Sequence, residues 1–112
     1  MSVQSLDEKD QTLVRRCLEF ILETQELEGE FETRIGVGRE EIRNILARWP
    51  DAGDELDGSS ATTAINNTLN EIAHGLHIAA ADEHAIGQSR GGVQALYWRW
   101  ARGRGWTATG LR

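Results

Sequence analysis

Apolar residues recur along this chain with the spacing of amphipathic helices, in stretches separated by polar and glycine-rich segments. In the first stretch Leu6, Leu13, Cys17 and Leu27 fall within about 80° of one another when successive residues are placed 100° apart around a helix. The later stretches follow the same period. Four principal helices are therefore predicted, over residues 5–29, 38–49, 59–77 and 89–103.

Residues typical of helix ends mark several of these boundaries. Ser5 followed by Glu8 is the pattern of a capping box, in which two side chains bond the free backbone amides of the first turn. Gly29 is suited to end the first helix, because glycine adopts the left-handed backbone conformation at little steric cost. Pro50 is expected to end the second helix, since it disfavours helical geometry in the residue before it.

The stretch from Ile35 to Trp49 occurs a second time 51 positions later, as residues 86–100. Five of the fifteen aligned positions are identical, where unrelated segments would share about one. The identical pairs are Ile35 and Ile86, Gly36 and Gly87, Arg39 and Arg90, Arg48 and Arg99, and Trp49 and Trp100. Apolar positions in the preceding helices follow the same offset. We interpret this pattern as the tandem duplication of a helix-loop-helix unit.

The predicted fold is all-α: a small orthogonal or bundle-like domain of four main helices. A chain of 112 residues is one domain by size and buries about two-thirds of its unfolded surface. We expect one domain over 1–112, a first unit at 5–50, a second at 59–103, and a flexible or surface-laid tail at 104–112. Short helical turns are allowed at 29–35 and 80–87. Trp49 and Trp100 should occupy equivalent places in one core.

The charge of the chain is negative overall but unevenly distributed. The net charge is −6, which disfavours nonspecific binding to nucleic acid or anionic lipid. Residues 1–58 hold fifteen acids and seven bases, whereas residues 84–112 hold five arginines and no acid. Either the basic end folds against the acidic start or remains solvated, or it forms a binding face; the first alternative is preferred.

The single cysteine, Cys17, cannot form an intramolecular disulfide. Its place on an apolar helix face favours a small buried hydrophobe over a reactive thiol. We find neither a signal-peptide pattern nor a stretch of about 18 apolar residues. A cytoplasmic protein without membrane insertion is expected.

The segment GVGREEIRNIL resembles the turn and second helix of the helix-turn-helix DNA-binding motif. Gly36 matches the turn glycine, and Val37, Ile42 and Ile45 match the apolar positions after it. The resemblance covers about 20 residues and implies a reading helix that contacts DNA. The motif requires a small residue four positions before the glycine. This chain departs from it there, because that position is Glu32. The second copy, rich in arginine, is the better candidate for nucleic acid.

Polar residues on the third helix are candidates for an interaction surface. Asn67, Asn70 and His74 are predicted to share the face opposite the apolar stripe. Asparagine is a poor helix former, so hydrogen bonding to another segment or to a partner would explain these residues; a hydrated polar face is the alternative. His77 points in a different direction from His74, so we expect no metal site and no cofactor.

The two copies differ most at Trp98, which replaces Ala47 on the outward side of its helix. A tryptophan flanked by Arg99 and Arg102 has the composition of a protein-binding hot spot. The alternative is that the C-terminal tail covers it. With no nucleophile paired to a base and no phosphate-binding glycine loop, the preferred hypothesis is a noncatalytic interaction or regulatory protein that binds a protein or itself. A duplicated helix-turn-helix nucleic-acid binder is the alternative.

Overall fold

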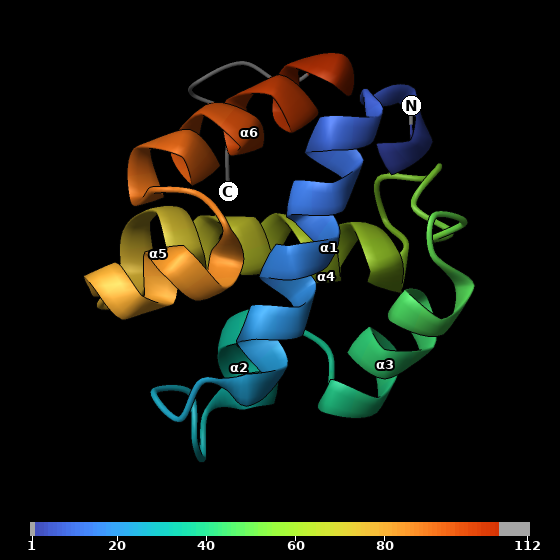
Figure 1. The fold of residues 1–112 in the computed structure, drawn as a ribbon. Helices are drawn as coiled ribbons and strands as arrows, with labels where there is room; N and C mark the ends of the chain where they lie inside the picture. Colours follow the sequence, from blue (N-terminus) through green and yellow to red (C-terminus); the bar gives the residue numbers. More distant parts are fainter. Residues whose placement is uncertain (1, 106–112) are drawn as a thin grey trace.

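The computed structural model describes residues 2–105, and all regular structure within them is helical (Figure 1). A 3₁₀ turn, η1, precedes the first α-helix, and a π-helical turn, η2, follows the fourth. The elements are η1 (Val3–Ser5), α1 (Glu8–Glu23), α2 (Phe31–Ile35), α3 (Arg39–Arg48), α4 (Ser60–Asn70), η2 (Glu71–Gly75), α5 (Ala80–Ile86) and α6 (Arg90–Gly103). The fold class is therefore all-α, as predicted.

The described chain has six α-helices where the sequence predicted four main ones. The two additional helices are α2 and α5, at the places where short turns were allowed. Each ends at a glycine in the left-handed conformation, Gly36 at φ 87° and Gly87 at φ 89°. The predicted tail begins directly after α6, where Arg104 and Gly105 form a turn and the Arg104 side chain is buried; residues 106–112, including Trp106 and Leu111, lie outside the described residues.

Three predicted helix ends were wrong. The first helix begins after Asp7, whose carboxylate accepts a bond from the Asp10 amide at 2.8 Å, and not after Ser5, which lies in the 3₁₀ turn. The same helix ends at Glu23, with Thr24 as its C-cap, rather than at Gly29. The third helix gives way at Asn70 to the π turn instead of continuing to His77.

Contacts from two other helices accompany the π turn. Its closing bond joins the Leu76 amide to the Glu71 carbonyl at 2.7 Å. On the α6 side, Arg90 donates to the Ile72 carbonyl at 3.2 Å and Gln94 to the Ala73 carbonyl at 3.0 Å. On the α2 side, Glu71 forms an ion pair with Arg34. Side chains distant in sequence therefore bond the carbonyls and the carboxylate of this turn.

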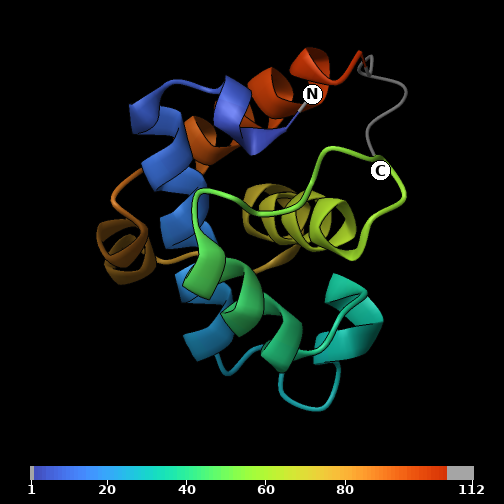
Figure 2. The same ribbon diagram turned by 90° about the vertical axis from the view of Figure 1, so that its right-hand side faces the viewer.

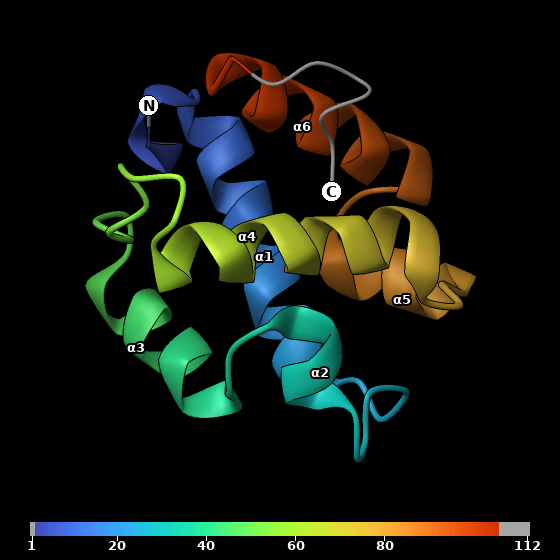
Figure 3. The ribbon, with the colours of Figure 1, turned by 180° about the vertical axis from the view of Figure 1, so that it is seen from behind.

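Helices α1 and α4 cross at the centre of the molecule, and the other helices surround them (Figure 3). Helix α3 packs on α1, and α6 packs on α4. The short helices pack across the two halves. Helix α5 of the second half packs on α1, and α2 of the first half packs on α4. Each half of the chain thus covers the first helix of the other half.

The core formed by this crossing is apolar and closed. Leu18, Ile21, Leu69 and Ile72 have no exposed surface. Cys17 is buried as well, and burial raises the pKa of its thiol to about 12, which suits the predicted role as a small hydrophobe. Trp100 is buried, whereas Trp49 is half-buried at the edge of the core.

A buried carboxylate joins the beginning, the middle and the end of the described chain. Asp54 accepts two hydrogen bonds from the Val3 amide, at 2.9 and 3.1 Å. Arg104, just after α6, lies 3.5 Å from the same carboxylate and donates to the Asp54 carbonyl at 2.8 Å. Burial raises the pKa of Asp54 above its ordinary value, and the Val3 bond and the Arg104 charge oppose that rise.

We predict that Gly36→Ala destabilises the protein more than Gly87→Ala or Gly29→Ala. All three glycines have positive φ, so each alanine costs about 1–2 kcal/mol of backbone strain. At Gly36 the new Cβ would also lie 2.7 Å from Thr63 Cγ2, whereas at Gly87 it meets only the flexible end of Arg16 and at Gly29 nothing within 4 Å. Urea unfolding of the three variants tests this order. Equal losses would show that α2 does not approach α4 so closely.

The Asp54 carboxylate predicts an unusual pH dependence of stability. Because its folded pKa is raised, the folded state holds this proton more tightly than the unfolded state, so its contribution to stability falls as pH rises above the ordinary value of 3.8. The stability advantage of the natural protein over Asp54→Asn should therefore be larger at acid pH than at neutral pH. Urea unfolding of both proteins between pH 3.5 and about 7 tests this. An advantage that grows with pH would mean that the pairing with Arg104 outweighs burial.

Candidate functional site

The face of α4 that receives the α2–α3 turn is lined by small polar and apolar side chains. Thr63 lies against Gly36, and Asn67 donates to the Ile35 carbonyl at 2.8 Å. Ser60 donates to the Glu41 carboxylate of α3 at 2.9 Å. Short side chains allow the turn and α3 to pack closely on α4, so this side of the molecule is closed.

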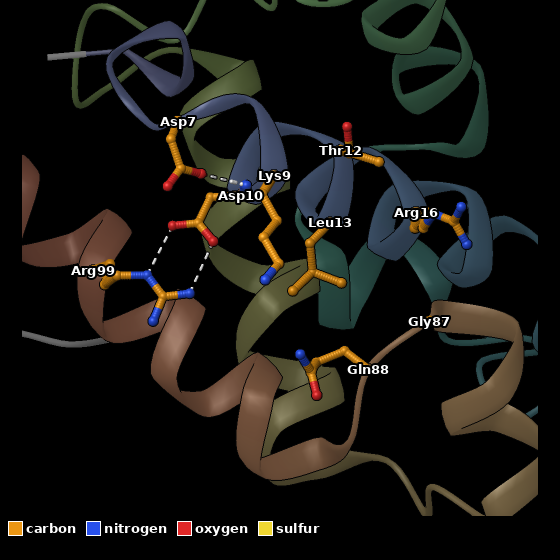
Figure 4. A pocket seen from close by; sticks show the side chains of 9 residues that line it. All are labelled: Asp7, Lys9, Asp10, Thr12, Leu13, Arg16, Gly87, Gln88 and Arg99. Atoms are coloured by element: carbon orange, nitrogen blue, oxygen red, sulfur yellow. Dashed lines mark hydrogen bonds and ion pairs between the residues drawn. The ribbon is translucent and has the colours of Figure 1, made fainter.

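The corresponding positions of α1, 51 residues earlier, carry longer side chains. Lys9 aligns with Ser60, Leu13 with Ala64 and Arg16 with Asn67. Whereas α3 packs on α4, α6 makes no comparably extensive contact with α1. An open groove of about 720 Å³ remains between them. This α1–α6 groove is lined by Asp7, Lys9, Asp10, Thr12, Leu13, Arg16, Gly87, Gln88 and Arg99 (Figure 4).

One end of the groove is closed by an ion pair. The Arg99 guanidinium donates two hydrogen bonds to the Asp10 carboxylate, at 2.8 and 2.9 Å, and its hydrogen bond to Asp10 raises its pKa further. Asp10 is itself buried near the start of α1. This bidentate pair is the strongest type of side-chain contact between a carboxylate and a base, and it spans the gap between α1 and α6.

The rest of the groove holds two exposed cations, Lys9 and Arg16, and the apolar side chain of Leu13. Leu13 is half-buried and packs on the core. Lys9 and Arg16 are exposed, and neither forms a hydrogen bond or ion pair with any residue that the structure describes. Lys9, Leu13 and Gln88 lie between the Asp10–Arg99 pair at one end and Arg16 at the other (Figure 4). The groove holds three basic side chains against two carboxylates, in a protein of net charge −6.

The structure places the three polar candidates of the third helix in different surroundings. Asn67 is half-buried, and its side-chain amide donates a hydrogen bond to the Ile35 carbonyl. Its neighbour Asn66 is buried and accepts a bond from the Tyr97 hydroxyl at 2.8 Å. Asn70 is half-buried, and His74, in the π turn, is exposed beside the Tyr97 ring. Of the two alternatives, hydrogen bonding to another segment is the one present at Asn67.

The arginines of the second half bond mainly within the molecule. Arg90 donates to the Ile72 carbonyl, and Arg99 pairs with Asp10. Arg104 lies against the ring of Trp100 and pairs with Asp54 and Asp57. This pattern supports the preferred alternative that the basic end folds against acidic residues. Arg102 is exposed, and Arg112 lies outside the described residues.

Trp98 has 37% of its surface exposed on α6, on the same helix as Arg99 and the exposed Arg102. The expectation that the tail covers this ring involves residues 106–112, which lie outside the described part of the chain. Within residues 2–105, Trp98 and Leu56 are the exposed large apolar side chains. Both stand as candidate contact residues.

Histidine, cysteine and acidic side chains are the potential metal ligands of residues 2–105. No group of three or more histidine, cysteine or acidic side chains there is arranged to hold a metal ion. His74, His77 and His84 are each exposed. Among the described helices, none has both the length and the apolar character needed to cross a membrane.

Sequence reasoning missed the residues that form the groove, apart from Arg99. Lys9, Leu13, Arg16 and Gln88 lie in two separate segments and match no motif. A comparison of side-chain size at positions 51 apart would have found the first three, because each aligns with a shorter side chain of α4.

Comparison of the chain with known protein families, with characterised proteins and with solved structures finds no match.

We predict that Trp98 is a contact residue whose replacement by alanine weakens its contact by more than about 1 kcal/mol while the core stays folded. The contact is with the tail, with a second copy or with another protein. Denaturant unfolding tests the contact with the tail, sedimentation tests the contact with a second copy, and recovery of partners from lysate tests the contact with another protein. A variant that matches the natural protein in stability, oligomeric state and recovered partners would remove Trp98 from the candidate surface.

Proposed function

We propose that this protein is a small noncatalytic interaction protein whose α1–α6 groove binds an acidic, partly apolar segment of another protein. One observation carries the proposal: the groove opens where the aligned surface of the other half is closed. We further propose that the halves arose by tandem duplication. Under that hypothesis, the surfaces of α1 and α4 were once equivalent. The longer side chains of Lys9, Leu13 and Arg16 now distinguish the α1 surface, which α6 does not cover and a partner can reach.

The chemistry of the groove favours an acidic ligand with an apolar side chain. Unpaired Lys9 and Arg16 would gain carboxylate partners, and their long side chains reach across an open groove. Leu13 offers apolar surface between these charges. Burying an apolar side chain there contributes about 25 cal/mol per Å², and a peptide segment can supply such a side chain and carboxylates at adjacent positions.

Several features support binding rather than catalysis. The acids of the groove are already occupied, Asp7 as a helix cap and Asp10 in its pair with Arg99. The thiol of Cys17 is buried with a raised pKa, so it suits neither nucleophilic chemistry nor disulfide exchange. A reducing, cytoplasmic setting is part of this proposal.

The rival proposal is a nucleic-acid binder that uses the α5–Gly87–α6 segment. A short helix, a glycine turn and a longer helix do follow one another there. The engagement of Arg90, Arg99 and Arg104 within the molecule makes fewer cations available for phosphates, and phosphate contacts supply most of such affinity. We therefore prefer the protein ligand.

Binding of a labelled synthetic peptide of alternating glutamate and leucine, measured by fluorescence polarisation at low salt, tests the proposal. We expect saturable binding that Arg16→Glu weakens about fivefold or more, since reversing a charge converts attraction into repulsion. Lys9→Glu should act in the same direction. Arg43→Glu is the matched control, because Arg43 is also exposed but lies on α3.

Two further probes separate the alternatives. A lysine–leucine peptide of equal length should bind weakly or not at all. A mixed-sequence DNA duplex that binds with steep salt dependence, while the acidic peptide does not, would favour the nucleic-acid proposal. Equal effects of Arg16→Glu and Arg43→Glu on the acidic peptide would show that net charge, rather than the groove, determines binding.

A further inference from the structure

Leu56 is the most exposed large apolar side chain in the described part of the protein. It lies in the loop between the two halves, with 74% of its surface exposed. Its neighbours in sequence are Glu55 and Asp57, both exposed. The segment therefore has the composition that the groove favours, a leucine between two carboxylates. We call residues 54–57 the Leu56 loop.

Hydrogen bonds on both sides of Leu56 hold this loop in place. The Leu56 carbonyl accepts bonds from the Thr62 hydroxyl at 2.7 Å and from the Ser59 amide at 3.1 Å. Asp57 pairs with Arg104 at 2.8 Å, and Asp54, the first residue of the loop, is buried. An exposed side chain on an already ordered loop loses little further conformational entropy when it binds. The Leu56 loop is thus preorganised to present its leucine outward.

The loop cannot fill the groove of its own molecule. It lies on the α3 side of α1, whereas the groove lies on the opposite side, toward α5 and α6 (Figures 1 and 2). Asp54 ties the loop to Val3 and to Arg104, and Arg104 lies at the opposite end of α6 from Gln88. A contact between loop and groove must therefore join two molecules.

We propose that the Leu56 loop of one molecule docks in the α1–α6 groove of a second copy. Leu56 would lie on Leu13, and Glu55 would face Arg16, so charge and apolar surface match together. This inference rests on the proposed function, because it assigns the acidic segment that the groove binds. The two surfaces are different, so the contact is heterologous and leaves one free loop and one free groove on every dimer. Longer assemblies grow as concentration rises.

Sedimentation velocity of the full chain at concentrations up to about 1 mM, the range in which small interfaces associate, tests the inference. The average mass should rise with concentration and fall with added salt. Leu56→Ser and Arg16→Glu should each keep the protein monomeric. Leu56→Met, which keeps an apolar side chain of similar volume, and Arg43→Glu, which makes the same charge change elsewhere, should associate like the natural protein.

Mixing the two monomeric variants is the decisive experiment. The Arg16→Glu protein still has a functional loop, and the Leu56→Ser protein still has a functional groove. Together they can form one loop–groove contact, so the mixture should give dimers and nothing larger. A mixture that stays monomeric, or that assembles beyond dimers, would overturn the inference, as would a natural protein that is monomeric throughout.

The result also separates this inference from the proposed function. If the glutamate–leucine peptide binds and Arg16→Glu weakens it, but the chain stays monomeric, then the groove binds acidic segments and the Leu56 loop is not its ligand. If neither peptide binding nor assembly depends on Arg16, both proposals are wrong. Circular dichroism of each variant confirms that a lost contact is not a lost fold.

Discussion

The structure depends on the crossing of α1 and α4, which neither half of the chain could cover alone. Each of these helices carries an apolar face that is too wide for the one longer helix that follows it in its own half. The remaining surface is covered by the short helix of the other half, α5 on α1 and α2 on α4. Burial of these faces supplies the main stabilisation, so it is available only when both halves are present.

The sequence predicted helices well where periodicity alone determines them. The second and fourth predicted helices agree with α3 and α6 within about two residues, the ordinary uncertainty of helix ends. The predictions failed where a distant residue decides the local structure. Asp54 binds the amide of Val3, the first residue of the 3₁₀ turn that contains Ser5. The side chains of Arg90 and Gln94 bond the π turn that ends the third helix. Neither contact follows from the residues near it in sequence.

The candidate site was harder to predict for the same reason. Exposed arginine and tryptophan residues on α6 were identified from composition, and Arg99 does lie at the groove. The sequence could not show that Arg99 is held by Asp10, which lies 89 positions away. The other groove residues became recognisable only when α1 was compared with α4. There, equivalent packing positions carry long side chains in one helix and short ones in the other.

The exchange of short helices has a consequence for the order in which the protein can fold during synthesis. When the first half leaves the ribosome, α1 lacks α5, and α2 has no α4 to pack on. The apolar faces of Leu18 and Ile21 then remain uncovered until the second half follows. The Asp54 carboxylate likewise cannot form its ion pair until Arg104 has been made. Contacts between residues far apart in sequence form late and slow folding, so the native core is completed only after α5, α6 and Arg104 have been made.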